Sequence, residues 1–407
     1  MAWLAISAVL QAKSPADEFR TRRAALRSSL ENGVLLLKGQ TEPYDPIDRF
    51  KQDPNFLYLT GWTDPGAVLL LTPAEEILFL PRHNARAEKY SGRRTSAEDP
   101  EARALTGFDK ILPVEKLEGE LDQALGSYSR VYAPWSAPYS GELRSRYPFR
   151  EVADATPLIA KLRLKKSDAE IAAIQHATDV SIQAHRAAWK RIAAGQYEYN
   201  IESGLIASFL EQGCEGPAYT PIVGSGPDGT ILHYMRNRRQ MDRGELVLVD
   251  AAAQCDSYAS DITRTIPVGG KFTPRQREVY EVVLGAEKAA IAGVRPGALI
   301  ASDSGESLTK IARDYINAHG KDLHGHPLGM YFTHDIGHHV GLQVHDPHSD
   351  APLEAGMVIT IEPGVYLSEE KLGARIEDVV LVTPNGAKVL SAALPKEPDE
   401  IEKAVSR

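Results

Sequence analysis

Histidines crowd into one short segment of the chain. Residues 324–348 hold seven of its twelve histidines. Within this segment, residues 333–346 (THDIGHHVGLQVHD) contain His334, His338, His339 and His345. Imidazole binds metal ions and exchanges protons near neutral pH. The cluster therefore indicates a metal site, proton transfer or both, and carboxylates elsewhere in the chain must decide between them.

Two aspartates lie on a predicted β-hairpin at residues 245–268, ELVLVDAAAQCDSYASDITRTIPV. With the turn centred on residues 255–256, Asp250 and Asp261 are equidistant from it and lie directly opposite each other. Opposed residues share one face of a hairpin, with Cβ atoms roughly 4.5–5.5 Å apart. Like charges placed that way are destabilising unless one is protonated or a cation lies between them. Solvated strand ends would explain a single aspartate, whereas the facing pair favours a cation.

A second predicted hairpin, at residues 357–382, repeats this pattern. A turn at residues 369–370 places Glu362 opposite Glu377, although the Pro-Gly dipeptide after Glu362 is expected to bulge the strand. The two acidic pairs and the histidine cluster make a mixed oxygen and nitrogen ligand set, with enough charge for two divalent ions. Such oxygen-rich sites suit manganese, cobalt or zinc better than copper.

Helix-start signals identify the elements that position these hairpins. Ser167 and Glu170 form an S-x-x-E capping box, and apolar residues then recur at helical spacing. Thr273 is followed by Pro274 and by Gln276, which together predict a second helix start. The expected helices cover about residues 167–193, 274–293 and 303–319. Helix followed by hairpin therefore occurs twice in the second half of the chain.

The first part of the chain, residues 19–157, is predicted to form a separate α/β unit. Three segments, FLYLTGW, AVLLLTP and EILFLPR, are strand-like and are separated by glycine and proline turns. Residues 154–167 are interpreted as a connection. A chain of 407 residues normally splits into two domains, which we place at residues 1–158 and 159–407.

Composition excludes several classes of protein. The net charge of −9 opposes a nucleic-acid partner, which normally requires a basic face. Cys214 and Cys255 form no Cys-x-x-Cys pair, so neither a disulfide scaffold nor a thiolate zinc site is expected. The apolar run at residues 2–10 is too short to span a membrane. It is interpreted as a helical arm of a cytoplasmic protein; alternatively, it is a signal remnant of a periplasmic or secreted one.

Several motifs carry a family resemblance over nearly the whole chain. They are VGSGPDGTILHY, LVDAAAQCDSYASDITRT, HDIGHHVGLQVHD, TIEPGVY and RIEDVVLV, in that order. With them the chain resembles the pita-bread metallopeptidases, and within these the Xaa-Pro aminopeptidases (aminopeptidase P) and prolidases. FKQDPNFLYLTGW and SGRR resemble the N-terminal half of aminopeptidase P. The resemblance implies an N-terminal α/β domain followed by a pita-bread catalytic domain with a curved, largely antiparallel sheet.

The resemblance also assigns the site residues. The implied ligands of two metal ions are Asp250, Asp261, His338, Glu362 and Glu377. Further active-site positions match His233, His334, His345, Tyr366 and Arg375. Arg375 lies two residues before Glu377, so on a strand both share one face. The remaining histidines of the cluster are interpreted as bystanders, namely His324, His326, His339 and His348.

The function implied is release of the N-terminal residue from peptides with proline second. Two divalent ions, manganese before cobalt or zinc, would hold a nucleophilic water, and Glu362 would accept its proton. His233 and His345 would hold the substrate and stabilise the oxyanion, and His334 would shape the proline pocket. The partners implied are proline-containing peptides and further copies of the chain in a homodimer or homotetramer. No membrane partner is expected.

Three alternatives remain at this point. Ala252 replaces a usual family glycine, His339 stands where tryptophan is common, and GLQVHD occurs in prolidases as well. A prolidase, which cuts only Xaa-Pro dipeptides, is the alternative within the family. It needs a group that blocks the far side of the proline or captures its free carboxylate; an arginine would suit that capture, and none can be assigned. A metal-free hydrolase of the creatinase kind and a non-enzymatic binding module both require eroded ligands, whereas all five are present here.

Overall fold

The computed structural model describes residues 15–42, 49–302 and 305–405. The apolar run at residues 2–10, and the expectations attached to it, lie outside this part of the chain. The contacts divide the chain into two units after Leu162, four residues beyond the boundary predicted from the sequence. Each unit is described by itself below.

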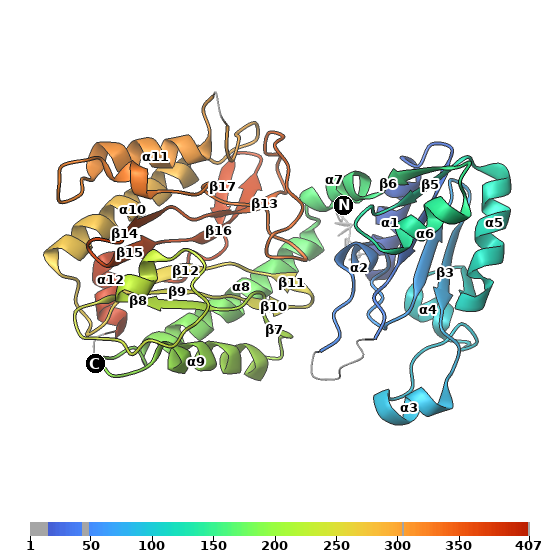
Figure 1. The fold of residues 1–407 in the computed structure, drawn as a ribbon, viewed down its shortest axis with the longest axis horizontal. Helices are drawn as coiled ribbons and strands as arrows, with labels where there is room; N and C mark the ends of the chain where they lie inside the picture. Colours follow the sequence, from blue (N-terminus) through green and yellow to red (C-terminus); the bar gives the residue numbers. More distant parts are fainter. Residues whose placement is uncertain (1–14, 43–48, 303–304, 406–407) are drawn as a thin grey trace, which may run out of the picture. The chain divides into compact units, whose positions relative to one another are not determined.

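The first unit is built on a six-stranded mixed sheet with the strand order β4-β3-β2-β1-β5-β6 (Figure 1). The strands are β1 Gly33–Lys38, β2 Val68–Leu71, β3 Glu76–Leu80, β4 Lys110–Pro113, β5 Arg130–Ala133 and β6 Glu151–Asp154. The helices are α1 Pro15–Arg27, α2 Pro54–Thr60, α3 Ala85–Ser91, α4 Ala102–Thr106, α5 Leu117–Ser127 and α6 Tyr139–Arg146. β1, β2 and β3 form an antiparallel meander, whereas the outer pairings are parallel. The expected α/β character of this half is confirmed.

The strand predicted for FLYLTGW was wrong, because these residues form helix α2. Asp53 accepts a hydrogen bond from the backbone N–H of Phe56, and Pro54 occupies the first helical turn. Gly61 ends the helix with a φ of 65°, in the left-handed region that glycine adopts without strain. These three local signals outweigh the strand-like composition of the segment.

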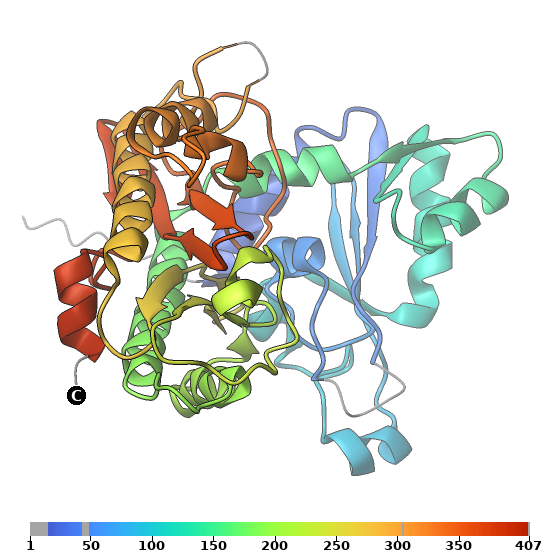
Figure 2. The same ribbon diagram turned by 60° about the vertical axis from the view of Figure 1, so that its left-hand side comes forward.

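The connection predicted at residues 154–167 contains a helix, α7 Thr156–Leu164. The other long helices are α8 Asp168–Trp189, α9 Glu198–Glu211, α10 Pro274–Gly293, α11 Leu308–His319 and α12 Pro398–Val405. The two predicted helix starts are confirmed, since Ser167 and Thr273 each form a capping box with the residue three positions later. Both views show α10 and α11 packed side by side (Figure 1, Figure 2).

The second unit contains short strands that pair only antiparallel within the described chain. The strands are β7 Gly216–Pro217, β8 Ile222–Ser225, β9 Leu246–Asp250, β10 Ala253–Cys255, β11 Tyr258–Ala259, β12 Thr263–Pro267, β13 Val358–Ile361, β14 Gly364–Leu367, β15 Leu372–Arg375, β16 Asp378–Thr383 and β17 Gly386–Val389. The 3₁₀ turns are η1 Val114–Lys116 in the first unit and η2 Gly226–Thr230 and η3 Leu328–Tyr331 in the second. The largely antiparallel sheet expected for this unit is confirmed.

The register predicted for the first hairpin was wrong by two residues. Thr263, not Asp261, pairs with Asp250, because the turn centres on Asp256 and Ser257. Both turn residues have positive φ, 52° and 68°, as a tight hairpin turn requires. A shift of two residues keeps a side chain on the same face of a strand. Asp261, in the break before β12, therefore still lies on the face of Asp250, one step along the hairpin.

The register predicted for the second hairpin is confirmed. Ile361 pairs with Asp378 and Gly364 pairs with Arg375, so the two halves of the hairpin share one register. Glu362 therefore lies opposite Glu377. The Pro-Gly dipeptide interrupts the ladder without inserting an extra residue, so the expected bulge is absent.

A disulfide joins Cys214 to Cys255, across a sequence separation of 41 residues. This bond was not predicted, because the sequence analysis expected no disulfide scaffold from these two cysteines. Their spacing carries no local signature, and only the antiparallel pairing of β7 with β10 brings the two Cα atoms to 4.4 Å. The bond fixes the segment before β7 to the hairpin that carries Asp250. Among the described helices, none combines the length and the apolar composition needed to cross a bilayer.

Candidate functional site

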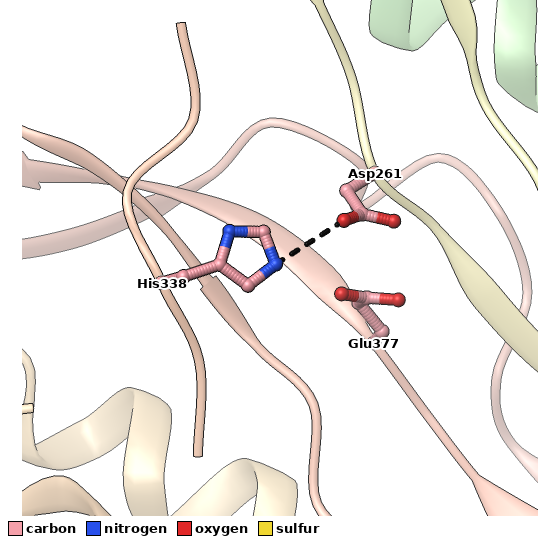
Figure 3. A group of neighbouring side chains, drawn as sticks. All are labelled: Asp261, His338 and Glu377. Carbon is pink, nitrogen blue, oxygen red and sulfur yellow. Dashed lines mark ion pairs between the residues drawn. The ribbon is translucent and has the colours of Figure 1, made fainter. Parts of the chain in front are cut away.

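Three side chains from distant segments converge in the second unit. Asp261, His338 and Glu377 each offer one ligand atom, and these atoms lie within 4.8 Å of one another (Figure 3). His338 Nε2 lies 3.4 Å from an Asp261 carboxylate oxygen. Asp261 precedes β12, Glu377 lies between β15 and β16, and His338 lies in the loop before β13. The group therefore depends on both hairpins and on the histidine-rich loop.

The other two predicted ligands adjoin this group. Glu362 Oε1 lies 3.5 Å from His338 Nε2, and Asp250 shares a hydrogen-bonding partner with Asp261. All five residues line one cavity of about 410 Å³. The structure thus brings together every residue that the sequence proposed as a ligand.

Tyr219 is a site residue that the sequence analysis missed. Its hydroxyl lies 2.5 Å from Asp250 Oδ1 and 2.5 Å from Asp261 Oδ1. Burial, followed by the charges of the two aspartates, raises the pKa of Tyr219 well above 10. One hydroxyl proton serves only one of these oxygens, so the other needs a proton or a cation. No spacing rule in the sequence identifies this residue, which lies on the segment after β7.

The carboxylates are crowded enough to require positive charge. Burial raises the pKa of Glu362 to about 7, and burial also raises the pKa of Asp250. Burial, then the neighbouring carboxylates, raises the pKa of Glu377 well above its usual range. Although burial opposes its protonation, hydrogen bonding to Asp261 raises the pKa of His338 to about 9. Protons therefore hold the cluster together unless multivalent cations replace them, and this donor set fits such cations.

The backbone of the histidine-rich loop orients the imidazole of His338. His338 Nδ1–H donates to the carbonyl oxygen of His339 at 3.2 Å, which leaves Nε2 for the carboxylates. The backbone N–H of His338 donates to Thr360 Oγ1. His339 was predicted to be a bystander; its buried ring nitrogens have no partner in the described chain, whereas its backbone supports the ligand.

Arg375 links the cluster to the outer part of the cavity. Its guanidinium donates to Asp250 Oδ2 at 2.5 Å and to the hydroxyl of Tyr366 at 3.0 Å. That hydroxyl donates in turn to His334 Nε2 at 2.9 Å. Burial lowers the pKa of His334 to about 4, so this ring is neutral near pH 7. Arg375 therefore contacts Asp250 directly, although its position in the sequence pointed to Glu377.

Glu377 is instead held through a threonine. Thr263 Oγ1 donates to Glu377 Oε2 at 2.6 Å and accepts from Arg375 Nε at 3.2 Å. Thr263 also forms an isolated backbone bridge with Glu377. Thr263, whose position opposite Asp250 the predicted register missed, therefore joins the two hairpins at the cluster, together with the contact of Arg375 with Asp250.

The remaining predicted histidines divide into two groups. His233 and His345 line the cavity, and the ring of His345 packs edge-on against His338 with centroids 4.3 Å apart. Burial lowers the pKa of His345. The bystanders lie outside the cavity lining and face other acids: His324 contacts Glu369, His326 contacts Asp322 and His348 contacts Asp350.

Asp346, beside His345, anchors the end of the histidine-rich loop. Its buried carboxylate accepts from Arg163 at 2.6 Å and from Lys166 at 3.1 Å. The three side chains are 1–3% exposed. These three residues carry no local signal in the sequence, because the two cations lie about 180 positions before the aspartate.

Comparison with known proteins places this cavity in context. Residues 172–384 match the model of metallopeptidase family M24, and residues 19–132 match that of the aminopeptidase P N-terminal domain. The chain is 34% identical to the Xaa-Pro aminopeptidase of Haemophilus influenzae, over 96% of this chain and 97% of that protein. It is 33% identical to the Xaa-Pro aminopeptidase of Escherichia coli, over 95% and 97%. The structure of Pseudomonas aeruginosa aminopeptidase PepP superposes with a TM-score of 0.86 at 31% identity, covering 97% of this chain and 99% of that one.

Proposed function

Because the chain belongs to metallopeptidase family M24, and within it to the Xaa-Pro aminopeptidases, we propose that its cavity releases the N-terminal residue from peptides with proline second. The observation that carries the proposal is the convergence of five ligand side chains in one cavity of about 410 Å³. The metal-free hydrolase and the non-enzymatic binding module would each require lost ligands. All five are retained here.

The proposed metal site uses two divalent ions, with manganese as the first choice and cobalt or zinc as alternatives. Asp250 and Asp261 would hold mainly one ion and His338 the other, and Glu362 and Glu377 would complete both. The bound ions supply Lewis-acid polarisation of the scissile carbonyl and an acidified water near neutral pH. The crowding of the carboxylates and the single Tyr219 proton shared between two of them support this assignment.

The protein side chains then have distinct roles. Glu362 accepts the proton of the attacking water; its carboxylate lines the cavity 3.5 Å from His338, and burial raises its pKa to about 7. His233 and His345 hold the substrate and stabilise the developing oxyanion. The neutral ring of His334, which is held by its hydrogen bond with Tyr366, forms one wall of the pocket for the proline ring. These roles suit the Xaa-Pro bond, whose tertiary nitrogen offers no N–H for a protease to grip.

The lining of the cavity favours an aminopeptidase over a prolidase. Within the described part of the chain, Arg375 is the only arginine that lines it. Its guanidinium already binds Asp250, Tyr366 and Thr263. Among the described lining residues, no guanidinium is left to capture the carboxylate of an Xaa-Pro dipeptide, a capture that would suit a prolidase.

The test compares three substrates on manganese-loaded protein: Ala-Pro-Ala, Ala-Ala-Ala and Ala-Pro. We expect release of alanine from Ala-Pro-Ala with the highest kcat/KM. Equal cleavage of Ala-Ala-Ala would refute proline specificity. Efficient cleavage of Ala-Pro without cleavage of Ala-Pro-Ala would establish the prolidase alternative.

The disulfide bears on the cellular compartment. Disulfides persist in oxidising compartments and are rare in the cytoplasm. The Cys214–Cys255 bond therefore supports the periplasmic or secreted alternative over the cytoplasmic location first expected. Thiol titration of denatured protein purified from its native compartment would find no free thiol if this proposal is right and two if it is wrong.

A further inference from the structure

One acidic side chain of the cavity stands apart from the ligand cluster. Five carboxylates line the cavity, and four of them are the proposed ligands. The fifth, Asp335, is exposed, and within the described residues its carboxylate makes no hydrogen bond or ion pair. Its backbone carbonyl accepts a hydrogen bond from His334 Nδ1 at 2.8 Å. The side chain is therefore a free charge beside the wall of the proposed proline pocket.

The charge of Asp335 has no direct counter-ion among the described residues that line the cavity. Two divalent ions would offset the four ligand carboxylates, and the guanidinium of Arg375 is bound to Asp250. Arg375 is the only arginine in the described lining, and no lysine lines the cavity there. In a loaded cavity Asp335 would therefore have no direct ion-pair partner among the described lining residues, and its side chain is exposed.

The proposed function directs the C-terminal side of a substrate toward the exposed part of the cavity lining. An aminopeptidase of the proposed kind holds a single residue before the scissile bond, so only the chain beyond proline must leave the buried centre. Asp335 directly follows His334, which the proposed function places against the proline ring. On this placement, the substrate group that would lie nearest Asp335 is the one attached to the proline carbonyl. In a dipeptide this group is a carboxylate, whereas in a longer peptide it is a neutral amide.

We infer that Asp335 is a specificity-determining residue that disfavours Xaa-Pro dipeptides by repelling their free carboxylate. The same charge favours longer peptides, and above all those with a basic side chain after proline. This inference rests on the proposed function. Two features would then act against Xaa-Pro dipeptides. The described lining has no free arginine to bind their carboxylate, and Asp335 repels that carboxylate.

The test replaces the charge alone, with Asp335→Asn. The substrates are Ala-Pro and Ala-Pro amide, which differ only in the charge beyond proline. We expect the kcat/KM ratio of Ala-Pro to Ala-Pro amide to rise about three- to tenfold in the variant, the range expected for like charges several ångströms apart near a surface. The rise should shrink in high salt. Ala-Pro-Lys should lose a similar factor relative to Ala-Pro-Ala.

The matched control is Asp350→Asn. Asp350 is 96% exposed, contacts His348 and does not line the cavity, so the variant makes the same change in net charge elsewhere. An unchanged substrate ratio in active Asp335→Asn protein, or an equal change in the control, would overturn the inference alone. Inactivity of the unaltered, manganese-loaded protein on every Xaa-Pro substrate would overturn the proposed function, and the inference with it.

Discussion

Arg375 Nη2 lies 2.5 Å from Asp250 Oδ2, although the two residues are 125 positions apart. The contact joins the end of β15 to the end of β9, and so ties one acidic hairpin to the other. A buried arginine between carboxylates contributes directional hydrogen bonds as well as charge. The proposed metal site is therefore assembled only when both hairpins are folded and docked together.

Removal of divalent metal should abolish activity. The crowded carboxylates need bound cations to remain ionised side by side, and the proposed reaction needs those cations. Protein dialysed against a chelator is therefore expected to be inactive on Ala-Pro-Ala. Manganese should restore the rate best, with a stoichiometry of two ions per chain by calorimetric titration. Full activity in rigorously metal-free protein would contradict the site assignment.

Loss of one ligand should remove activity without unfolding the chain. Asp261→Ala and Glu377→Ala each leave the opposing carboxylates crowded, so metal affinity should fall at least about 10–100-fold. Circular dichroism should show the native fold. Glu369→Ala is the control, because Glu369 lies on the same hairpin as Glu377 and is 69% exposed. Wild-type rates for either ligand variant in limiting metal would show that these residues do not bind it.

Tyr219→Phe should weaken metal binding while preserving the packing of the ring. The variant removes the hydroxyl that lies 2.5 Å from both Asp250 and Asp261, so the two carboxylates lose the group that lies between them. We expect about a 10–100-fold loss of manganese affinity, as for other residues that orient metal ligands. Tyr331→Phe is the matched control, since that hydroxyl also donates to a carboxylate, Asp322, at 2.9 Å. Equal affinities in the two variants would refute the role of Tyr219.

Acid should destabilise the second unit through His185. Burial lowers the pKa of this fully buried ring to about 4, below its usual value of 6.5. The unfolded state therefore binds more protons than the folded state between about pH 6.5 and 4, and stability falls as the pH drops through that window. His185→Gln should reduce the loss of melting temperature between pH 7 and pH 5. The exposed His348→Gln should leave it unchanged, and an identical loss in both variants would contradict the assignment.

Assembly into a homodimer or homotetramer is the fifth prediction. The expectation comes from the resemblance of the N-terminal half to aminopeptidase P. Sedimentation velocity at micromolar concentration should give a mass of two or four chains of 44.5 kDa. A single species with the mass of one chain would refute the prediction.

Local signals in the sequence predicted much of this architecture. The capping residues Ser167 and Thr273 located two helices, because caps act within one turn. The pairing of Glu362 with Glu377 could be predicted because both residues are equally far along the chain from the turn at residues 369–370. The same count failed for Asp250 because the turn residues Asp256 and Ser257 adopt positive φ without the Asn-Gly signature.

The features that the sequence did not reveal depend on contacts between distant segments. Tyr219 reaches Asp261 across 42 positions, and Asp346 reaches Arg163 across 183. Neither pair has a spacing that recurs in a regular element. The disulfide was missed for the same reason, since it follows from the pairing of β7 with β10. Counting around the turns proposed the four carboxylates and the resemblance singled out His338, whereas the contacts that support these residues required the structure.

Because Asp346 forms buried ion pairs with Arg163 and Lys166, substitutions at residue 346 and at its neighbour, residue 345, should have different effects. Loss of Asp346 would strand two cations that are 3% and 1% exposed, and an uncompensated buried charge costs about 3–5 kcal/mol. Loss of His345 removes only a ring from the cavity wall. In a scan of all substitutions, changes at 346 would therefore deplete the protein from the cell. Substitutions at residue 345 would leave the abundance of the protein unchanged but would remove its enzymatic activity.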